Sequence, residues 1–281
     1  MNAKKETLVV SFSGGRTSAY MARWLQLNKA DEYELKFVFM NTGGEDERTL
    51  NFVNQCDKEF GFNLVWIEAD VIHGERVGTK YKIVDFETAS RNHEPFYDVV
   101  KKYGIPNQSY PHCNRELKLA PFNEWLKDNC PNAYRAIGIR CDEIDRMAAD
   151  MDKMKIVYPF IKWHPTRKGD VLGWWSRQSF DLDVPEHYGN CVTCWKKSDK
   201  KLLTIAHESP ELFDHFHNME IIARGAGANA ENNKGNFFRK NRSTQDILEL
   251  SRSNFEEFKD KYYNTANDIS NGCSDSCDLF G

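Results

Sequence analysis

The stretch Ser11-Phe12-Ser13-Gly14-Gly15-Arg16-Thr17-Ser18 decides how the chain begins to fold. It follows a short apolar run at 7–12 (TLVVSF) and precedes a helix-like stretch at 18–28. Two glycines allow a sharp turn close to an anion, and the helix that follows offers unpaired N–H groups and the positive end of its dipole. The hydroxyl and guanidinium side chains add donors suited to phosphate. An ordinary glycine turn is the alternative, but position and composition favour an anion site.

Alternation of strands and helices continues along the first half of the chain. Further apolar runs rich in β-branched and aromatic residues occupy 35–40, 63–68 and 134–139. Helix-like stretches lie at 47–60 and 114–128. This pattern predicts an α/β fold, a parallel twisted sheet with helices on both faces. The segment 70–113 contains three prolines and is predicted to be mostly loop, bordering the site.

The character of the chain changes after Pro165. Amphipathic helices and no strand are predicted from there on, at 168–178, 198–207, 209–219, 244–251 and 254–262. Trp174 and Trp175 have the helical spacing of core residues, which we favour over a base-stacking platform. We therefore expect a nucleotide-binding α/β domain at 1–165 and a helical, cysteine-bearing region at 166–281.

Composition narrows the class of protein. The chain has 281 residues, with 38 Lys and Arg against 42 Asp and Glu, a net charge of −4. This balance argues against a protein that binds nucleic acid over its whole surface. No apolar run approaches the roughly 20 residues of a membrane span, and the N-terminus lacks the pattern of a signal peptide. We expect a cytoplasmic protein without membrane contact; the oligomeric state is open.

One local basic segment remains a candidate for nucleic acid. Residues 223–242 carry five basic side chains, interleaved with two phenylalanines: Arg224, Lys234, Arg239, Lys240 and Arg242, with Phe237 and Phe238. A nucleic-acid acceptor would find its natural contact there. A solvated loop is the alternative, and the sequence favours it.

Eight cysteines include two close pairs, Cys191-x2-Cys194 and Cys273-x3-Cys277. In a reducing compartment such pairs indicate metal or redox chemistry rather than disulfides. The first pair is predicted to lie at a helix start, with lysines nearby that favour the thiolate form. Cys56 and Cys130 are interpreted as structural, because buried cysteine behaves as a small hydrophobic residue.

Four segments together resemble a known family. Ser13–Ser18 resembles the SGGxxS pyrophosphate loop (PP-loop) of the N-type ATP pyrophosphatases, which have a Rossmann-like fold. Segments 41–45 (NTGGE), 113–122 (CNRELKLAPF) and 138–143 (GIRCDE) are similar to segments of the branch that contains phosphoadenosine-phosphosulfate (PAPS) reductases. The resemblance covers roughly residues 7 to 160. The last third is similar to phage- and prophage-associated PAPS-reductase-like proteins.

The resemblance implies an adenine-nucleotide site across the carboxyl ends of the strands. The phosphates would be held by Ser11, Ser13, Gly14, Gly15, Arg16, Thr17 and Ser18, with Gly138 also at the nucleotide. Asn41 and Thr42 would lie near the nucleoside, although a plain turn is an equal alternative. Arg115, Lys118 and Arg140, with Arg16, would face the anionic substrate as catalytic groups, and Lys118 has the alternative of a solvated helix position. Asp142 and Glu143 either hold Mg²⁺ or pair with Arg146, and we favour pairing.

The cysteines suggest a metal or redox centre. Cys113 resembles a family ligand, so five candidates exist: Cys113, Cys191, Cys194, Cys273 and Cys277. A [4Fe–4S] cluster is favoured over zinc because the family has precedent for a cluster, and a redox dithiol is the third alternative. Cys273 and Cys277 are also candidate nucleophiles.

Departures from the family pattern bear on the reaction. The intact SGG and following Ser favour a member that uses ATP, whereas Arg16 and Thr17 replace the usual Lys and Asp. The tandem cysteine of the family is here Cys113-Asn114. The leading hypothesis is ATP adenylation at the α-phosphate with pyrophosphate release, coupled to sulfur transfer from a thiol or sulfide donor. Sulfonucleotide reduction (of PAPS or adenylyl sulfate) to sulfite and non-catalytic nucleotide binding are the alternatives.

Overall fold

The computed structural model describes residues 5–74, 77–106, 111–224 and 235–253. A six-stranded sheet lies at its centre, in the order β4-β3-β2-β1-β5-β6. The strands are β1 (Glu6–Phe12), β2 (Tyr33–Asn41), β3 (Val65–Asp70), β4 (Lys80–Val84), β5 (Tyr134–Ala136) and β6 (Ile156–Val157). All neighbours pair in parallel except β4, which runs antiparallel to β3. The predicted α/β class is confirmed.

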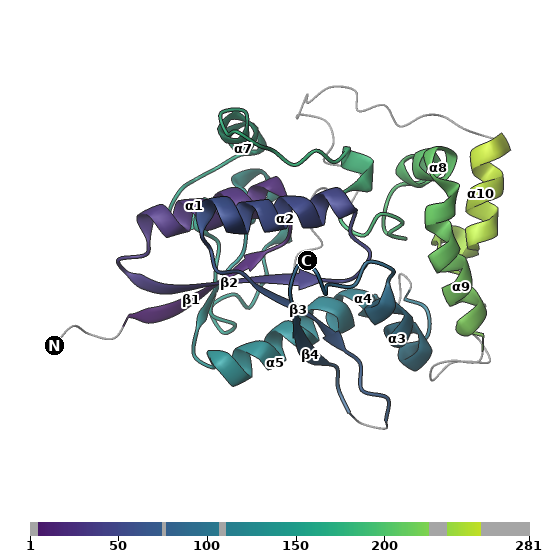
Figure 1. Cartoon of the computed structure of the whole chain (residues 1–281), viewed down its shortest axis with the longest axis horizontal. Coiled ribbons are helices and arrows are strands. Elements are labelled where there is room, and N and C mark those ends of the chain that lie inside the picture. The colour runs from purple at the N-terminus through teal and green to yellow at the C-terminus, as the bar shows by residue number, and fades with distance from the viewer. Residues whose placement is uncertain (1–4, 75–76, 107–110, 225–234, 254–281) are drawn as a thin grey trace.

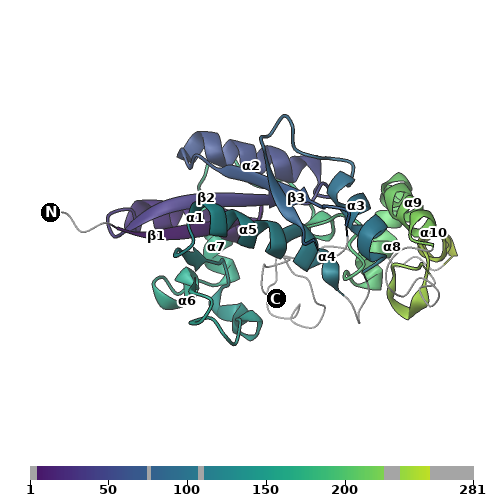
Figure 2. The same ribbon diagram turned by 90° about the horizontal axis from the view of Figure 1, so that it is seen from below.

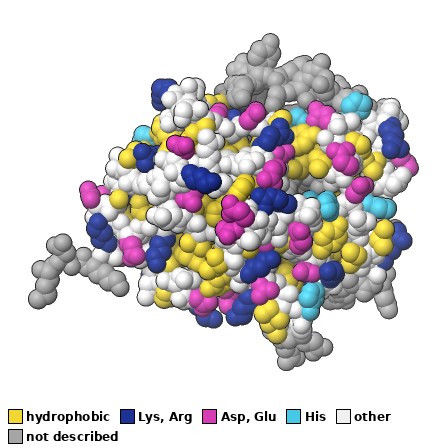
Figure 3. Space-filling model, in the orientation of Figure 1, with side chains coloured by type: hydrophobic (Ala, Val, Ile, Leu, Met, Phe, Trp, Pro, Cys, Tyr) yellow, Lys and Arg dark blue, Asp and Glu magenta, His cyan; other side chains and the backbone are white. Residues whose placement is uncertain are grey.

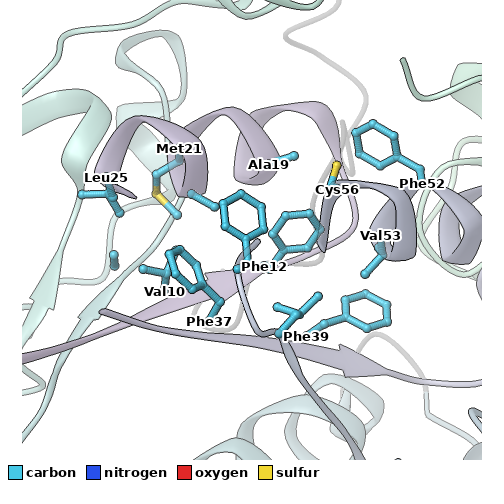
Figure 4. Packing of buried hydrophobic residues seen from close by; sticks show 14 of the residues in the cluster. Val10, Phe12, Ala19, Met21, Leu25, Phe37, Phe39, Phe52, Val53 and Cys56 are labelled. Carbon is cyan, nitrogen blue, oxygen red and sulfur yellow. The ribbon is translucent and has the colours of Figure 1, made fainter. Parts of the chain in front are cut away.

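Helices cover both faces of the sheet. The helices α1 (Arg16–Asn28) and α2 (Glu47–Phe60) lie on one face and α5 (Ala120–Asn129) on the other, as Figure 1 shows. Figure 4 shows the first of these interfaces, where Phe12, Phe37 and Phe39 of the strands pack beneath the two helices. On the opposite face, Phe122 and Trp125 of α5 pack against the strands. The central strands are therefore buried on both sides, as their continuous apolar runs predict.

The bounds of α2 follow from its terminal residues. Asp46 is the N-cap, and its side chain accepts a hydrogen bond from the backbone N–H of Arg48. Gly61 ends the helix in a left-handed conformation with φ of 65°, which glycine adopts without steric cost. The connection from β2 to this helix, residues 42–46, is thereby fixed at the carboxyl edge of the sheet.

Residues 70–113 are more regular than predicted. They contain β4 and the helix α3 (Glu94–Tyr103). The strand β4 is an exposed edge strand with lysines at two of five positions, so it lacks the apolar signal of a buried strand. In α3 the proline that suggested a loop, Pro95, occupies the first turn, where a missing N–H costs nothing.

The helix predicted at 114–128 is interrupted. It consists of α4 (His112–Asn114), a π-helical turn η1 (Arg115–Leu119) and then α5. Such π-turns insert one residue into a helix and re-aim the side chains that they carry. The turn carries Arg115 and Lys118, two of the predicted substrate-facing residues.

Helices predominate after residue 158. They are α6 (Pro159–Lys162), α7 (Lys168–Trp175), α8 (Asp199–Glu208), α9 (Asp214–Ile222) and α10 (Thr244–Ser253), with 3-10 turns η3 (Glu186–Tyr188), η4 (Pro210–Phe213) and η5 (Arg239–Asn241). A further 3-10 turn, η2 (Cys141–Arg146), lies earlier, between β5 and β6. The predicted helical C-terminal region is confirmed for the described residues, whereas the helix predicted at 254–262 lies outside them. Figures 1 and 2 both show α8, α9 and α10 together, beyond the carboxyl ends of the parallel strands.

Two hydrophobic cores draw on residues from either side of position 165. Val171 and Trp175 of α7 join the core under α1 and α2. The second core combines α3 residues such as Phe96 with Phe216 of α9 and Leu202 of α8. The predicted boundary at 165 therefore does not separate the cores. Within the described ranges, no helix is long and apolar enough to cross a membrane.

Candidate functional site

The turn after β1 has the geometry of an anion-binding loop. Gly14 has a φ of +82°, and a Cβ there would lie 2.9 Å from Cγ2 of Thr49 on α2, so only glycine fits. Ser18 closes the turn: its Oγ accepts hydrogen bonds from the N–H and the hydroxyl of Ser13, at 3.1 and 3.0 Å, and donates to the carbonyl of Gly15 at 3.0 Å. Ser11 is buried in β1 just before the turn.

The N-terminus of α1 has no anion of its own. Its N-cap residue, Gly15, has no side-chain oxygen, and its first turn contains no acidic residue. The first N–H groups of a helix have no intrahelical acceptor, and the helix dipole favours negative charge there. This end of the helix therefore suits an external anion such as a phosphate.

A second segment approaches the loop from β5, the neighbour of β1. A Cβ on Gly138 would lie 3.4 Å from the Cα of Ser18, so glycine allows the two segments to approach closely. Nη1 of Arg140 donates to Oγ1 of Thr17 at 3.1 Å, and the Arg140 side chain is only 4% exposed. The fold thus brings two predicted site segments together at the point where the strand order reverses.

The acidic residues after Arg140 pair with arginines. Nε of Arg140 lies 3.1 Å from Asp142, and its Nη2 lies 3.3 Å from Glu143. Glu143 also pairs with Arg146 at 2.6 Å. The favoured pairing of Glu143 with Arg146 is confirmed. These ion pairs neutralise one edge of the buried guanidinium and hold it beside the loop, with its Nη1 on Thr17.

Arg16 points to a different partner. Its Nε lies 2.6 Å from the carboxylate of Asp181, and its Nη2 donates to the carbonyl of Leu182. Both acceptors belong to the segment that follows α7. The guanidinium predicted to face the substrate is thus engaged by the C-terminal region.

Asn41 and Thr42 are buried at the carboxyl end of β2, and their side chains are used within the fold. The Asn41 amide donates to Glu68 of β3 at 2.6 Å and to the carbonyl of Ser90 at 2.8 Å. The Thr42 hydroxyl donates to Glu45 at 2.8 Å. The geometry is that of an internally bonded turn, the alternative predicted for these residues.

The π-turn separates Arg115 from Lys118. The Arg115 side chain is 63% exposed, and its Nε lies 2.6 Å from Glu116. Lys118 is buried, which excludes the alternative of a solvated helix position. The buried Glu116 also accepts a hydrogen bond from the hydroxyl of Thr79. The turn therefore buries one predicted basic residue and exposes the other.

The Cys191–Cys194 turn lies against the loop that follows β2. Cys191 forms a bridge with Glu45, and Val192 donates its N–H to the carbonyl of Gly44 at 3.0 Å. The prediction of a helix start here is wrong: Cys191–Cys194 form turns, and α8 begins only at Asp199, where Ser198 supplies the N-cap. The cysteine pair is nevertheless at the sheet edge that holds the phosphate loop.

The other predicted cysteine ligands do not complete a set within the described part of the chain. No three His, Cys, Asp or Glu side chains gather there as metal ligands would. Cys273 and Cys277 lie outside the described residues. Cys56 and Cys130 are buried, and burial raises the pKa of both thiols, which agrees with their structural interpretation.

His93 is a residue that sequence reasoning missed. It is buried, and neither ring nitrogen has a hydrogen-bond partner among the described residues. Its Nε2 would lie 2.8 Å from a Cβ on Gly44, and its ring lies tilted against that of His215 of α9, with centroids 4.7 Å apart. Burial, with the nearby His215, lowers the pKa of His93 to about 4. No sequence motif marks this residue; only the tertiary packing does.

The aromatic side chains of the basic segment are not available for stacking on bases. Phe237 and Phe238 are buried in the second core, which overturns their predicted part in a nucleic-acid contact. Arg242 pairs with Asp199 at 2.6 Å, and residues 225–234 lie outside the described ranges. On the face in Figure 3, basic and acidic side chains intermingle.

The predicted core position of Trp175 is confirmed by its burial.

Comparisons with known proteins give one matching family model and uncharacterized relatives. A family model described as the phosphoadenosine phosphosulfate reductase domain matches residues 7–167. The uncharacterized nin region protein ORF290 of Escherichia phage lambda is 32% identical over 279 residues, which are 97% of this chain and 95% of that protein. An uncharacterized protein of Methanocaldococcus jannaschii is 26% identical over 235 residues, 79% of this chain and 49% of its own length.

Proposed function

The chain belongs to the phosphoadenosine phosphosulfate reductase domain family, and we propose that it binds ATP at Ser13–Ser18 and transfers the adenylyl group with release of pyrophosphate. Membership of the family makes it a nucleotide-utilising, sulfur-related enzyme at the level of the family. The choice of ATP is supported by the intact Ser13-Gly14-Gly15 turn and Ser18, whose hydroxyl holds that turn closed.

The contact between Arg140 and Thr17 carries the proposal. It places a buried guanidinium, held along one edge by Asp142 and Glu143, with its Nη1 beside a helix N-terminus whose first turn has no acidic residue. Backbone N–H groups and a guanidinium converging on one point are the donors that a polyphosphate needs. The close approach of Gly138 to Ser18 keeps the two sets of donors together.

In the proposed reaction, a nucleophilic atom of the acceptor attacks the α-phosphorus of ATP. The bond between the α-phosphorus and the bridging oxygen breaks, and pyrophosphate leaves with the electron pair. A thiolate or sulfide then displaces AMP from the adenylated acceptor. The residues of the loop and Arg140 contribute by positioning the phosphates and neutralising their charge, which accounts for most catalysis of such transfers.

A second candidate, sulfonucleotide reduction, is favoured by the cysteine position. Sγ of Cys191 lies 3.4 Å from Oγ1 of Thr42, at the carboxyl end of β2. In that reaction a thiolate attacks the sulfur of PAPS or adenylyl sulfate, the nucleotide leaves, and a second thiol releases sulfite as a disulfide forms. The pairing of Arg16 with Asp181 favours the third candidate, nucleotide binding without turnover.

We also propose that Cys191 and Cys194 contribute to a [4Fe–4S] cluster, with ligands outside the described residues. Two soft sulfur donors on one turn fit iron, and also zinc, but a pair alone does not complete either site. A bound cluster would supply redox or sulfur-binding chemistry. The chain's own turn, held by the bonds from Val192 and to the Cys191 carbonyl, orients the two thiols.

The test compares two products and two arginine variants. Wild-type protein is incubated with ATP and a dialysed cell extract that supplies acceptors, and separately with PAPS or adenylyl sulfate and a dithiol; pyrophosphate and sulfite are measured against extract alone. Pyrophosphate supports the proposal; sulfite alone supports reduction; binding without either product supports the third candidate. Arg140→Lys keeps the charge but loses the fork, and we expect about tenfold weaker ATP binding.

Arg23→Lys is the matched control. Arg23 lies further along α1, with its guanidinium bonded to Gln26 and stacked over Phe60, away from the loop. ATP affinity should be unchanged in this variant. If ATP fails to bind wild-type protein, or if Arg140→Lys binds ATP as well as wild type does, the site is not where we propose it.

A further inference from the structure

Residues 176–184, which we name the strap, are tied to the first helical residue of the phosphate loop. Arg16 pairs with Asp181 of the strap at 2.6 Å, and its second nitrogen donates to the carbonyl of Leu182. The backbone carbonyl of Arg16 accepts a hydrogen bond from Nε1 of Trp175 at 2.9 Å. Both the side chain and the main chain of Arg16 are therefore held by one stretch of the C-terminal region.

The strap itself is anchored in the core. The ring of Phe180 packs among Trp175, Phe60 and Phe52, with centroids 5.5, 5.6 and 6.1 Å away. Trp175 is almost fully buried in that core. Asp181 follows Phe180 directly, so its carboxylate has a fixed place from which to hold Arg16.

These contacts change what Arg16 contributes. A guanidinium whose Nε and Nη2 are bound to a carboxylate and a carbonyl is already charge-neutralised along one edge. A lysine ammonium, as in the resembling loops, is a single point of charge and lacks the planar fork for these two acceptors. The arginine at this position thus matches the strap in shape and charge.

We propose that Arg16 is a positioning residue rather than a phosphate ligand. Together with Asp181 it fixes the first turn of α1, so that the N–H groups of the loop point to one place before a nucleotide arrives. The expected effect on nucleotide affinity rests on the proposed function. The contacts between the loop and the strap do not, because they are present in the chain without nucleotide.

The test is a double-mutant cycle on ATP affinity with Arg16→Gln, Asp181→Asn and the double variant. We expect each single variant to bind ATP about tenfold more weakly, with the double variant no worse than either, because all three lose the same contact. Asp183→Asn is the matched control: it makes the same charge change in the strap at an exposed carboxylate. Weak binding by Arg16→Gln, with Asp181→Asn binding as well as or better than wild type, would overturn the proposal.

A second measurement does not depend on nucleotide. Amide hydrogen exchange of nucleotide-free protein should rise in both 13–19 and 176–184 in Asp181→Asn, and in neither segment in Asp183→Asn. Unchanged exchange in Asp181→Asn overturns the inference even if ATP binds. If ATP does not bind wild-type protein, the proposed function fails while exchange still decides whether the strap orders the loop.

Discussion

Sγ of Cys191 lies 3.4 Å from Oγ1 of Thr42, although 149 residues separate the two in the sequence. The contact is supported by the backbone bridge between Cys191 and Glu45. It brings the cysteine turn to the strand ends where the phosphate loop also lies. A thiol or a metal held there would be close to a nucleotide, which is the arrangement that sulfur transfer to or from a nucleotide requires.

The first prediction concerns metal content. Protein purified without oxygen should contain iron and acid-labile sulfide, about four of each per chain for a [4Fe–4S] cluster. Cys191→Ala and Cys194→Ala should each lose most of both, because each removes one sulfur donor of the turn. Cys130→Ala is the control, since Cys130 is the buried C-cap residue of α5, and it should retain them. Zinc in place of iron, lost in the same two variants, would identify the other metal; metal content unaffected by either variant would dismiss this turn as a ligand.

The second prediction concerns Asn41 and stability. The Asn41 amide donates to Glu68, whose side chain is fully buried. Asn41→Asp replaces an amide donor with a second carboxylate against Glu68, which keeps its ion pair with Lys82, and we expect a loss of about 1–3 kcal/mol in the free energy of unfolding because a buried hydrogen bond is lost. Urea denaturation measures this. Asn51→Asp, at an exposed position on α2, should change stability by less than about 0.5 kcal/mol. Equal effects of the two substitutions would contradict this role for Asn41.

The sequence predicts those features of the structure that neighbouring residues determine. It does not predict features that depend on residues far away along the chain. The strand, turn and helix at 7–28 are specified locally, by an apolar run, two glycines and a helix-forming stretch, and they were predicted. The role of Asn41 stays open in the sequence, because Asn-Thr-Gly-Gly at a strand end suits a ligand contact or a plain turn equally. Which one applies depends on Glu68, 27 residues later.

Features that depend on remote partners were missed. Arg16 has the side chain of a phosphate ligand, and nothing in its neighbourhood reveals that Asp181 engages it from 165 residues away. The burial of Phe237 and Phe238 depends likewise on packing against α9 and α3. From local composition alone, basic residues beside two phenylalanines suggest an exposed segment that contacts nucleic acid.

The third prediction concerns pH and His93. Its pKa in the folded protein is about 4, below the ordinary value of 6.5, because burial and His215 disfavour the charged ring more than Glu94 favours it. Between pH 6.5 and 4 the unfolded chain therefore binds a proton that the folded chain does not. Stability falls as the pH drops through this window, by about 3 kcal/mol in all from this residue.

The measurement is the free energy of unfolding at several pH values in wild type and in His93→Asn, which cannot take up the proton and tolerates the left-handed backbone at this position. The variant should lose much of the slope between pH 6.5 and 4. His73→Asn, at an exposed histidine, should keep the slope of wild type. A slope unchanged in His93→Asn would assign the acid sensitivity to other groups.

The fourth prediction concerns the approach of β5 to the phosphate loop. A Cβ on Gly138 would lie 3.4 Å from the Cα and 3.6 Å from the N of Ser18, and 3.7 Å from Cγ2 of Thr17. Gly138→Ala is therefore tolerable with a small adjustment, whereas the two further methyl groups of Gly138→Val must displace the first turn of α1. We expect ATP affinity to fall less than about threefold in the alanine variant and about tenfold or more in the valine variant. Gly169→Val is the control, because a Cβ at Gly169 meets nothing within 4 Å. Thermal unfolding separates lost binding from lost folding: a Gly138→Val protein that melts as wild type does and still binds ATP fully would show that the two segments do not share a ligand.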